Sequence, residues 1–241
     1  MLIADRYERR TRLTPGLLVV LPVAFVVVGL GLKDQPVLSV ATGLLSAVGL
    51  PVLLASTVRV RGLAVQSKLF GEWGCSPTTA SLRHYGHGAS SHQRHLWRTE
   101  LSAATGHELP TSETELADPP RADAKYESAV SRLREMTRDR KQFPLIFEEN
   151  CNYGFERNLL GVRRIGLVMS LISVAGLVAA IVVRANVVTP LSLQSLIIAL
   201  VLDVLLLAMW LLAPSAPRAR VVGFRYAERL LNGAAHVKEN P

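Results

Sequence analysis

The chain has 241 residues, 49% of them hydrophobic, and its 27 lysines and arginines against 19 acids give a formal net charge of +8. Its apolar residues are gathered in four windows without Lys or Arg, each long enough to cross a bilayer. The windows are Pro15–Leu32, Pro36–Ser56, Ile165–Val183 and Leu191–Ala213. They exclude an ordinary soluble protein, whose core helices are rarely apolar on every face over such a length. Two distant cysteines favour neither a disulfide framework nor a metal site.

The basic N-terminal segment, residues 1–14, leads into a predicted hairpin of two membrane helices at residues 15–56. The first window is longer than the apolar part of a typical signal peptide. No cleavage site of the small-x-small type precedes the second window. We therefore expect a retained first helix, joined to the second by a tight turn through Lys33-Asp34-Gln35.

Small residues recur at helical spacing in two of the windows. Ser39, Gly43 and Ala47 are four residues apart in the second window. Gly166 is the first of several small residues on one face of the third window. Residues of this kind let helix backbones approach closely. They predict packing within one four-helix bundle, and contact between copies of the chain is the alternative.

Basic residues gather in the N-terminal segment, at both ends of residues 57–164, and in the C-terminal segment 214–241. The positive-inside rule places all three on the cytoplasmic side. It predicts a cytosolic domain at 57–164, a second membrane hairpin at 165–213, and both termini in the cytoplasm. We expect the membrane to be a bacterial inner membrane. Anionic lipid headgroups account for the positive charge, so the expected partner is the bilayer and no nucleic acid is needed.

The predicted cytosolic domain is mainly helical. An amphipathic helix extends over residues 63–73, and a second helix begins with a Ser76 cap followed by Pro77. A short helix is expected around Trp97.

Residues 106–124 are acidic, contain prolines and lack periodicity, which predicts a loop. The next helix is clear, because its apolar residues fall on one face. These residues are Tyr126, Ala129, Val130, Leu133 and Met136. The apolar run Phe143–Phe147 that follows predicts a strand or a buried extended segment.

Four histidines, His84, His87, His92 and His95, lie close together with the spacing H-x2-H-x4-H-x2-H. Imidazoles bind zinc and copper, so the group is a candidate metal site. The spacing matches no standard zinc module, and a Gly/Ser loop occupies its middle. A polar loop without metal is therefore the favoured interpretation.

The stretch EENCNYGFERNLLGVRR, residues 148–164, leads into the third window. Gly154 permits a tight bend, and asparagines such as Asn158 can satisfy the backbone groups of a turn. The candidate coupling residues are Glu148, Glu149, Tyr153 and Arg157. The stretch is either a structural elbow, which we favour, or an element that transmits domain movement to the third helix. The two roles are compatible.

Asp203 is the only acid in the four windows. A carboxylate at the bilayer centre costs about 2.5–3.5 kcal/mol, so it is usually paired, protonated or exposed to water. Ser170 and Ser173 are the expected hydrogen-bond partners, because they lie at similar depth in the third window. We favour a polar clasp between helices or copies, with the lining of a pore and ion-coupled transport as alternatives.

The segments LREMTRDR, FPLIFEEN and YGFERNLLG, between Ala122 and Gly166, carry a resemblance to other proteins. They resemble stretches in uncharacterised bacterial four-helix integral membrane proteins with an EENxxYGFxRNLLG-like juxtamembrane segment. The resemblance covers about a fifth of the chain and implies an architecture without an activity. Bacterial proteins of this architecture include membrane effectors of antiphage and stress systems.

The chain contains no nucleophile elbow, phosphate-binding glycine loop, H-E-x-x-H motif or dinucleotide fingerprint. We predict an all-α protein with four transmembrane helices in two hairpins, a mainly helical cytosolic domain between them, and no cofactor. Three functions are open. We favour a non-enzymatic, oligomeric membrane effector or channel whose cytosolic domain senses a ligand or partner. The alternatives are a scaffold that recruits a cytosolic protein and a metal-dependent membrane enzyme.

Overall fold

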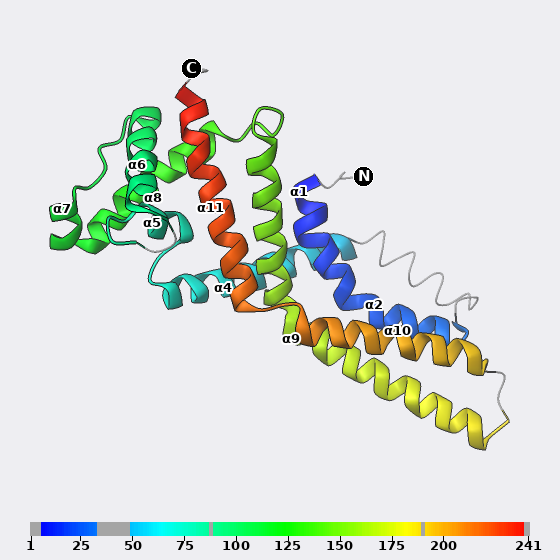
Figure 1. The fold of residues 1–241 in the computed structure, drawn as a ribbon. Coiled ribbons are helices and arrows are strands. Elements are labelled where there is room, and N and C mark those ends of the chain that lie inside the picture. The colour runs from blue at the N-terminus through cyan, green and yellow to red at the C-terminus, as the bar shows by residue number, and fades with distance from the viewer. Residues whose placement is uncertain (1–5, 33–48, 87–88, 189–190, 239–241) are drawn as a thin grey trace. The chain divides into compact units, whose positions relative to one another are not determined.

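The computed structural model describes residues 6–32, 49–86, 89–188 and 191–238 (Figure 1). Within these residues the elements are helices, and no strand is present, which confirms the all-α prediction for the described part of the chain. In order they are α1 (Arg6–Glu8), the π-helix η1 (Arg9–Leu13), α2 (Thr14–Gly29), α4 (Leu50–Trp73), α5 (Pro77–Leu82), α6 (Ser91–Thr105), α7 (Ser112–Ala117), α8 (Pro119–Met136), α9 (Pro144–Asn186), α10 (Leu193–Leu212) and α11 (Ala216–Lys238).

The chain divides into two compact units. The membrane unit comprises Met1–Val65 and Gly154–Ser215, and the polar unit comprises Gln66–Tyr153 and Ala216–Pro241. Two helices, α4 and α9, pass the boundary without a break. Each of them therefore contributes residues to both units.

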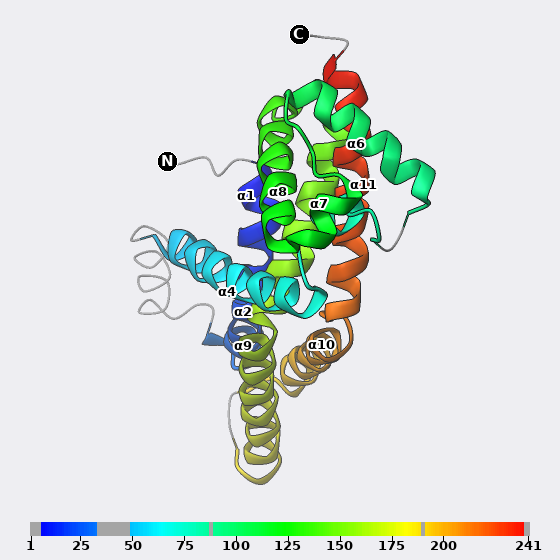
Figure 2. The same ribbon diagram turned by 90° about the vertical axis from the view of Figure 1, so that its left-hand side faces the viewer.

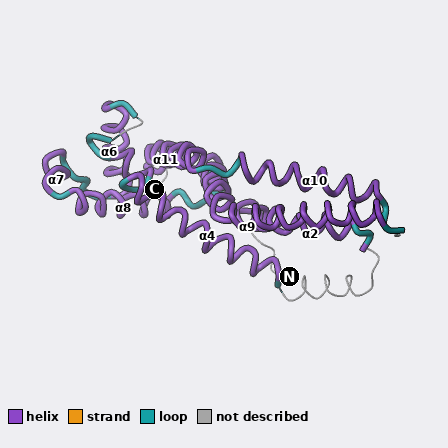
Figure 3. Tube along the Cα trace, turned by 90° about the horizontal axis from the view of Figure 1, so that it is seen from below, coloured by secondary structure: helices purple, strands orange, loops and turns teal. Residues whose placement is uncertain are grey.

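Three helical segments are long and apolar enough to cross a membrane: Arg6–Gly29, Pro144–Asn186 and Leu193–Leu212. They contain most of the first, third and fourth windows, and they suggest a membrane protein. The second window, Pro36–Ser56, lies mostly outside the described residues, so a fourth span stays a prediction. Figure 3 shows α2, α10 and the later part of α9 extending side by side within the membrane unit.

The interior of the membrane unit is apolar, and so is much of its outer surface. Its two buried clusters are Val19, Val58, Leu159, Val162, Leu206 and Trp210, and Leu177, Leu196 and Ala199. On the outer surface Ile172 of α9 is 64% exposed and Leu205 of α10 is 62% exposed. Side chains of this kind are stable against hydrocarbon chains but not against water.

Glycines bring the membrane helices into close contact. A Cβ atom added to Gly161 of α9 would lie 2.7 Å from the backbone carbonyl carbon of Arg61 in α4. A Cβ atom on Gly166 would overlap the indole ring of Trp210 in α10. These positions exclude any larger residue without a shift of the helices. The other predicted packing residues, Ser39, Gly43 and Ala47, lie outside the described residues.

The polar unit has a hydrophobic core of its own. The predicted apolar face of α8 is buried, with Tyr126, Ala129 and Leu133 each 0% exposed. Residues of α6 and α11 pack around it, and the indole N–H of Trp97 donates to the side-chain oxygen of Asn232 at 2.7 Å. Figure 2 shows α6, α8 and α11 gathered in this unit.

Capping residues define the short helices of the polar unit. The Ser76 hydroxyl accepts from the backbone N–H of Thr79, and Pro77 occupies the first turn, so the predicted start of α5 is confirmed. The prediction of a loop at 106–124 is wrong from Ser112 onward, where the stretch contains α7 and the start of α8. Thr111 caps α7 and Asp118 caps α8, and such local caps stabilise the start of a helix where no apolar periodicity marks it.

Phe143–Phe147 is not a strand. Pro144 begins α9, and Ile146 packs into the core of the polar unit from the first turn of this helix. Proline is compatible with the first turn of a helix, because the N–H that it lacks would have no partner there.

The C-terminal segment contains α11, a helix of 23 residues. One face of α11 is fully buried in the polar unit through Ala227, Leu230 and Ala234. The segment that sequence analysis treated as a basic tail therefore supplies part of a core.

Candidate functional site in the membrane helices

Asp203 lies near the middle of α10, on the face of this helix that is turned inward. The buried residues of α10 follow one another at intervals of three and four: Leu196, Ala199, Asp203, Leu206 and Trp210. This spacing places them on one side of a helix. Apolar packing of the other four residues thus holds the Asp203 side chain, which is 0% exposed, inside the membrane unit.

The structure brings Asp203 together with the two serines that sequence analysis selected. Ser170 and Ser173 of α9 are 0% and 5% exposed, and both hydroxyls lie near enough to the carboxyl group to interact with it. Ser173 donates its hydrogen bond elsewhere, to the backbone carbonyl of Pro22 in α2, at 3.2 Å. The site therefore joins three helices, α2, α9 and α10.

The hydrogen bonding of this site is incomplete. Among the described residues, no hydrogen bond of good geometry reaches either carboxyl oxygen of Asp203 or the hydroxyl of Ser170. A buried polar group without a partner is costly, and a carboxylate is the most costly case. A proton on Asp203 would remove the charge and provide a donor for Ser170, and a monovalent cation or water molecule would also satisfy the group.

Next to this site, α9 contacts the end of α10. The guanidinium of Arg163 donates to the backbone carbonyls of Trp210, at 3.1 Å, and Leu211, at 2.8 Å. These carbonyls belong to the last turn of α10, where intrahelical donors are lacking. Together with the contact of Gly166 on the Trp210 ring, this cap fixes α9 against α10 about two helical turns from Asp203.

Asn158 forms a second polar junction in the membrane unit. It is 0% exposed, and its side-chain N–H donates to the backbone carbonyl of Thr11 in η1 at 2.7 Å. Gly62 of α4 packs directly on the same amide group. Asn158 is thus a junction between helices, and the turn predicted for it from the sequence is not formed. The signal for this junction was the pair Asn158 and Gly161, an amide and a glycine three residues apart on one helical face.

The predicted bend at Gly154 is wrong, because α9 is helical through the whole stretch 148–164. Gly154 instead lies against the N-terminal helix, and a Cβ atom there would be 3.0 Å from the hydroxyl of Tyr7. The glycine is thus explained by a close approach of helices rather than by a turn.

The four candidate coupling residues fall on both sides of the boundary in α9. Glu148, Glu149 and Tyr153 belong to the polar unit, and Arg157 belongs to the membrane unit. The Tyr153 ring stacks on Tyr226 of α11, with centroids 6.2 Å apart, and Arg157 donates to the side-chain oxygen of Asn158 at 3.2 Å. Each end of the stretch is therefore attached to the core of its own unit.

The histidines do not form a metal site in the described residues. A ring nitrogen of His84 lies 3.1 Å from the backbone carbonyl of Pro110, while His92 and His95 are exposed on α6. His87 lies outside the described residues. Within the described ranges, no three side chains of His, Cys, Asp or Glu come close enough to hold a metal ion.

The polar unit contains one buried acid with a complete set of partners, Glu115. It is 6% exposed and accepts from the backbone N–H of His84, at 3.1 Å to each oxygen, and from the Tyr126 hydroxyl at 2.8 Å. Burial raises the pKa of Tyr126, and the hydrogen bond to Glu115 raises it further. This arrangement holds α7 on α8.

Comparison of the chain with models of protein families, with curated proteins and with solved structures gave no match. The function is therefore argued from the geometry of Asp203 and of the helices around it.

Proposed function

We propose that the chain is a non-enzymatic, oligomeric membrane effector. Its polar unit receives a ligand or partner, and its membrane helices respond by opening a path or changing their packing. The observation that carries this proposal is the continuity of α9. This single helix places Ile146 in the core of the polar unit and Ser170 and Ser173 at the Asp203 carboxyl group.

A continuous helix is a suitable transmitter. Ile146 and Ser170 are 24 residues apart, which corresponds to about 36 Å along an α-helix. No turn or loop interrupts the hydrogen bonds of α9 between these residues. We expect a change in the packing of Ile146 to alter the packing of the serines at Asp203 through this helix.

The unpaired carboxyl group favours a second arrangement of the membrane helices. In the state described here Asp203 is fully buried and lacks hydrogen bonds of good geometry. A rearrangement that brings water, a hydroxyl group or a second copy of the chain to Asp203 recovers part of the cost of burying it. A ligand or partner of the polar unit then shifts the equilibrium to the extent that it binds one of the two states more tightly than the other.

The setting of the proposed effector is a bacterial inner membrane, with four spans and both termini in the cytoplasm. The basic residues of the N-terminal segment, the central segment and α11 support this orientation. Antiphage or stress defence is the pathway that this architecture suggests.

The first experiment measures the mass of the complex in nanodiscs by native mass spectrometry. We expect a defined oligomer for the wild type. A monomer would refute the oligomeric effector and would favour the alternative of a partner-recruiting scaffold. One observation favours that alternative. Tyr85 and Leu116 are 67% and 64% exposed on neighbouring segments of the polar unit, where a partner protein would cover them.

The second experiment tests transmission through α9. A Ser173→Cys variant, in a background with Cys75→Ser and Cys151→Ala, reports access to the Asp203 site by its rate of reaction with a small maleimide. We expect slow labelling, and a several-fold faster rate when Ile146→Ala loosens the polar end of α9. Leu145→Ala is the matched control, because Leu145 is 60% exposed whereas Ile146 is 7% exposed. Equal rates in both variants would show that α9 does not transmit.

A further inference from the structure

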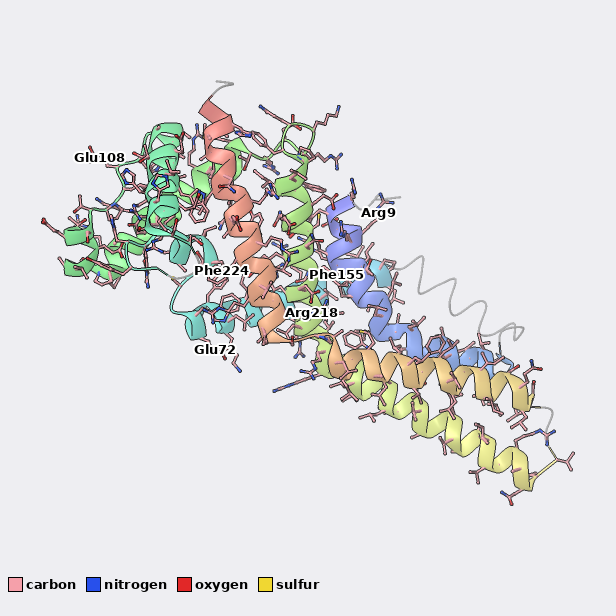
Figure 4. All side chains as sticks on the ribbon, viewed as in Figure 1. Arg9, Glu72, Glu108, Phe155, Arg218 and Phe224 are labelled. Carbon is pink, nitrogen blue, oxygen red and sulfur yellow. The ribbon has the colours of Figure 1, made fainter. Side chains whose placement is uncertain are left out.

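An aromatic cluster with an arginine on its surface lies in the polar unit where α4 ends and α11 begins. The rings of Phe70 and Trp73 in α4 have centroids 6.0 Å apart, and the ring of Phe224 in α11 lies 6.5 Å from Trp73. The guanidinium carbon of Arg220 is 5.6 Å from the centroid of Phe224 and 6.0 Å from that of Trp73. Phe224 and the neighbouring Arg218 are marked in Figure 4.

The cluster is not part of the buried core of the polar unit. Its three rings are partly exposed and Arg220 is exposed. The neighbouring Val221 is 58% exposed. Partly exposed Trp and Phe rings beside an arginine are typical of the boundary between hydrocarbon and water, where the rings and the cation each find their preferred surroundings.

Arg220 retains its capacity to bind an anion. The two rings occupy a face of the guanidinium, and among the described residues no carboxylate pairs with it. The nearest acid on α4, Glu72, is paired with Lys68 at 3.7 Å. The edge of a guanidinium carries five N–H groups in a plane and matches a phosphate in a bidentate manner.

The covalent chain brings this cluster close to a bilayer. The candidate span α10 ends at Leu212 and α11 begins at Ala216. Three intervening residues reach at most about 14 Å, and Arg220 lies about 6 Å further along the helix. A membrane surface is therefore always within reach of the cluster, whereas a soluble partner would have to compete with it.

We propose that Phe70, Trp73, Arg220 and Phe224 form an interfacial anchor that binds the phosphate headgroup of an anionic lipid. The rings lie at the level of the headgroups and Arg220 binds the phosphodiester. This anchor fixes the start of α11 at the membrane surface, and it does not depend on the effector proposal.

The test uses the full chain in nanodiscs and the fluorescence of Trp73. The other two tryptophans, Trp97 and Trp210, are 5% and 0% exposed, so the difference between wild type and Trp73→Phe isolates the signal of Trp73. Brominated phosphatidylglycerol is titrated into brominated phosphatidylcholine, and quenching is measured against the fraction of anionic lipid. We expect the Trp73 signal to be quenched as phosphatidylglycerol is added.

Arg220→Gln should raise the fraction of phosphatidylglycerol at half-maximal quenching about fivefold, because one arginine near an anionic surface contributes about that factor. Lys141→Gln is the control, since it removes the same charge from an exposed position in the turn before α9. The proposal is overturned if Trp73→Phe leaves the quenching unchanged, or if Arg220→Gln and Lys141→Gln shift the midpoint equally. Relief of the quenching by inorganic phosphate would assign the site to a soluble anion instead.

Discussion

The two units of this protein contain buried acids in opposite situations. In the polar unit, Glu115 accepts hydrogen bonds from the backbone of His84 and from the Tyr126 hydroxyl. In the membrane unit, Asp203 is still more deeply buried and receives no hydrogen bond of good geometry from the described residues. The cost of the missing hydrogen bonds is greater for Asp203, because a bilayer around the membrane unit supplies no water to an unpaired group.

This difference in hydrogen bonding indicates different roles for the two acids. A fully satisfied buried acid fixes one conformation, since every alternative loses its hydrogen bonds. An unsatisfied acid raises the energy of the state in which it is found, and such costs are retained mainly where function needs them. We therefore expect Glu115 to contribute to the stability of the polar unit, and the proposed response of the membrane unit depends on Asp203.

The largest effect is expected where the membrane unit is most tightly packed. Gly161→Val should destabilise the protein by about 3 kcal/mol, because the new side chain would push the backbones of α4 and α9 apart. Thermal unfolding in detergent measures it. Gly176→Ala is the control on the same helix, since nothing lies within 4 Å of a Cβ atom there, and its stability should be unchanged. Equal losses in the two variants would mean that α4 does not cross α9 at Gly161.

Removal of Glu115 should have an effect of similar size on the polar unit. Glu115→Leu should lower the free energy of unfolding by about 2–4 kcal/mol, because it leaves the His84 N–H and the Tyr126 hydroxyl without an acceptor. Chemical denaturation followed by near-ultraviolet circular dichroism measures the change. The matched variant Glu113→Leu alters an exposed acid of the same helix and should cost far less. A small effect of Glu115→Leu would remove the distinction between the two acids.

The same substitution at Asp203 should change the stability in the opposite direction. Asp203→Leu should stabilise the membrane unit by about 2.5–3.5 kcal/mol, because it replaces a buried carboxyl group that lacks hydrogen bonds with an apolar side chain. The more stable protein should also be unresponsive, with slow labelling at Ser173→Cys even when Ile146→Ala is present. Val204→Leu, at a neighbouring outward position that is 46% exposed, is the control. A loss of stability in Asp203→Leu would show that another copy of the chain satisfies the carboxyl group.

Periodicity and caps account for the parts of the structure that sequence analysis anticipated. The apolar face of α8 and the Ser76-Pro77 start of α5 are local signals, and they were correct. The apolar windows likewise required only length and composition. Ser170 and Ser173 were found as neighbours of Asp203 because depth in a bilayer can be counted along each helix.

The features that sequence analysis missed depend on contacts between distant segments. Gly154 and Asn158 are typical turn residues, yet α9 is continuous because Tyr7, Thr11 and Gly62 pack against them. α11 is basic enough to resemble a tail, and its buried face is visible only once the core of the polar unit is known. Tertiary packing overrides local preference in both cases.

The smallest expected effect concerns pH and the buried phenol of Tyr126. The pKa of Tyr126 is raised in the folded protein by burial and by the hydrogen bond to Glu115, relative to about 10 in an unfolded chain. The unfolded state then loses its proton first, so stability is complete below pH 10 and falls above it, by up to about 1.4 kcal/mol per pH unit.

In Tyr126→Phe the stability near neutral pH should drop by about 1 kcal/mol, with a flatter decline above pH 10. Tyr85→Phe, at a site that is 67% exposed, should keep the wild-type slope. Denaturation series at several alkaline pH values measure the slopes, and identical slopes for wild type and Tyr126→Phe would mean that the pKa of this phenol is not raised in the folded protein.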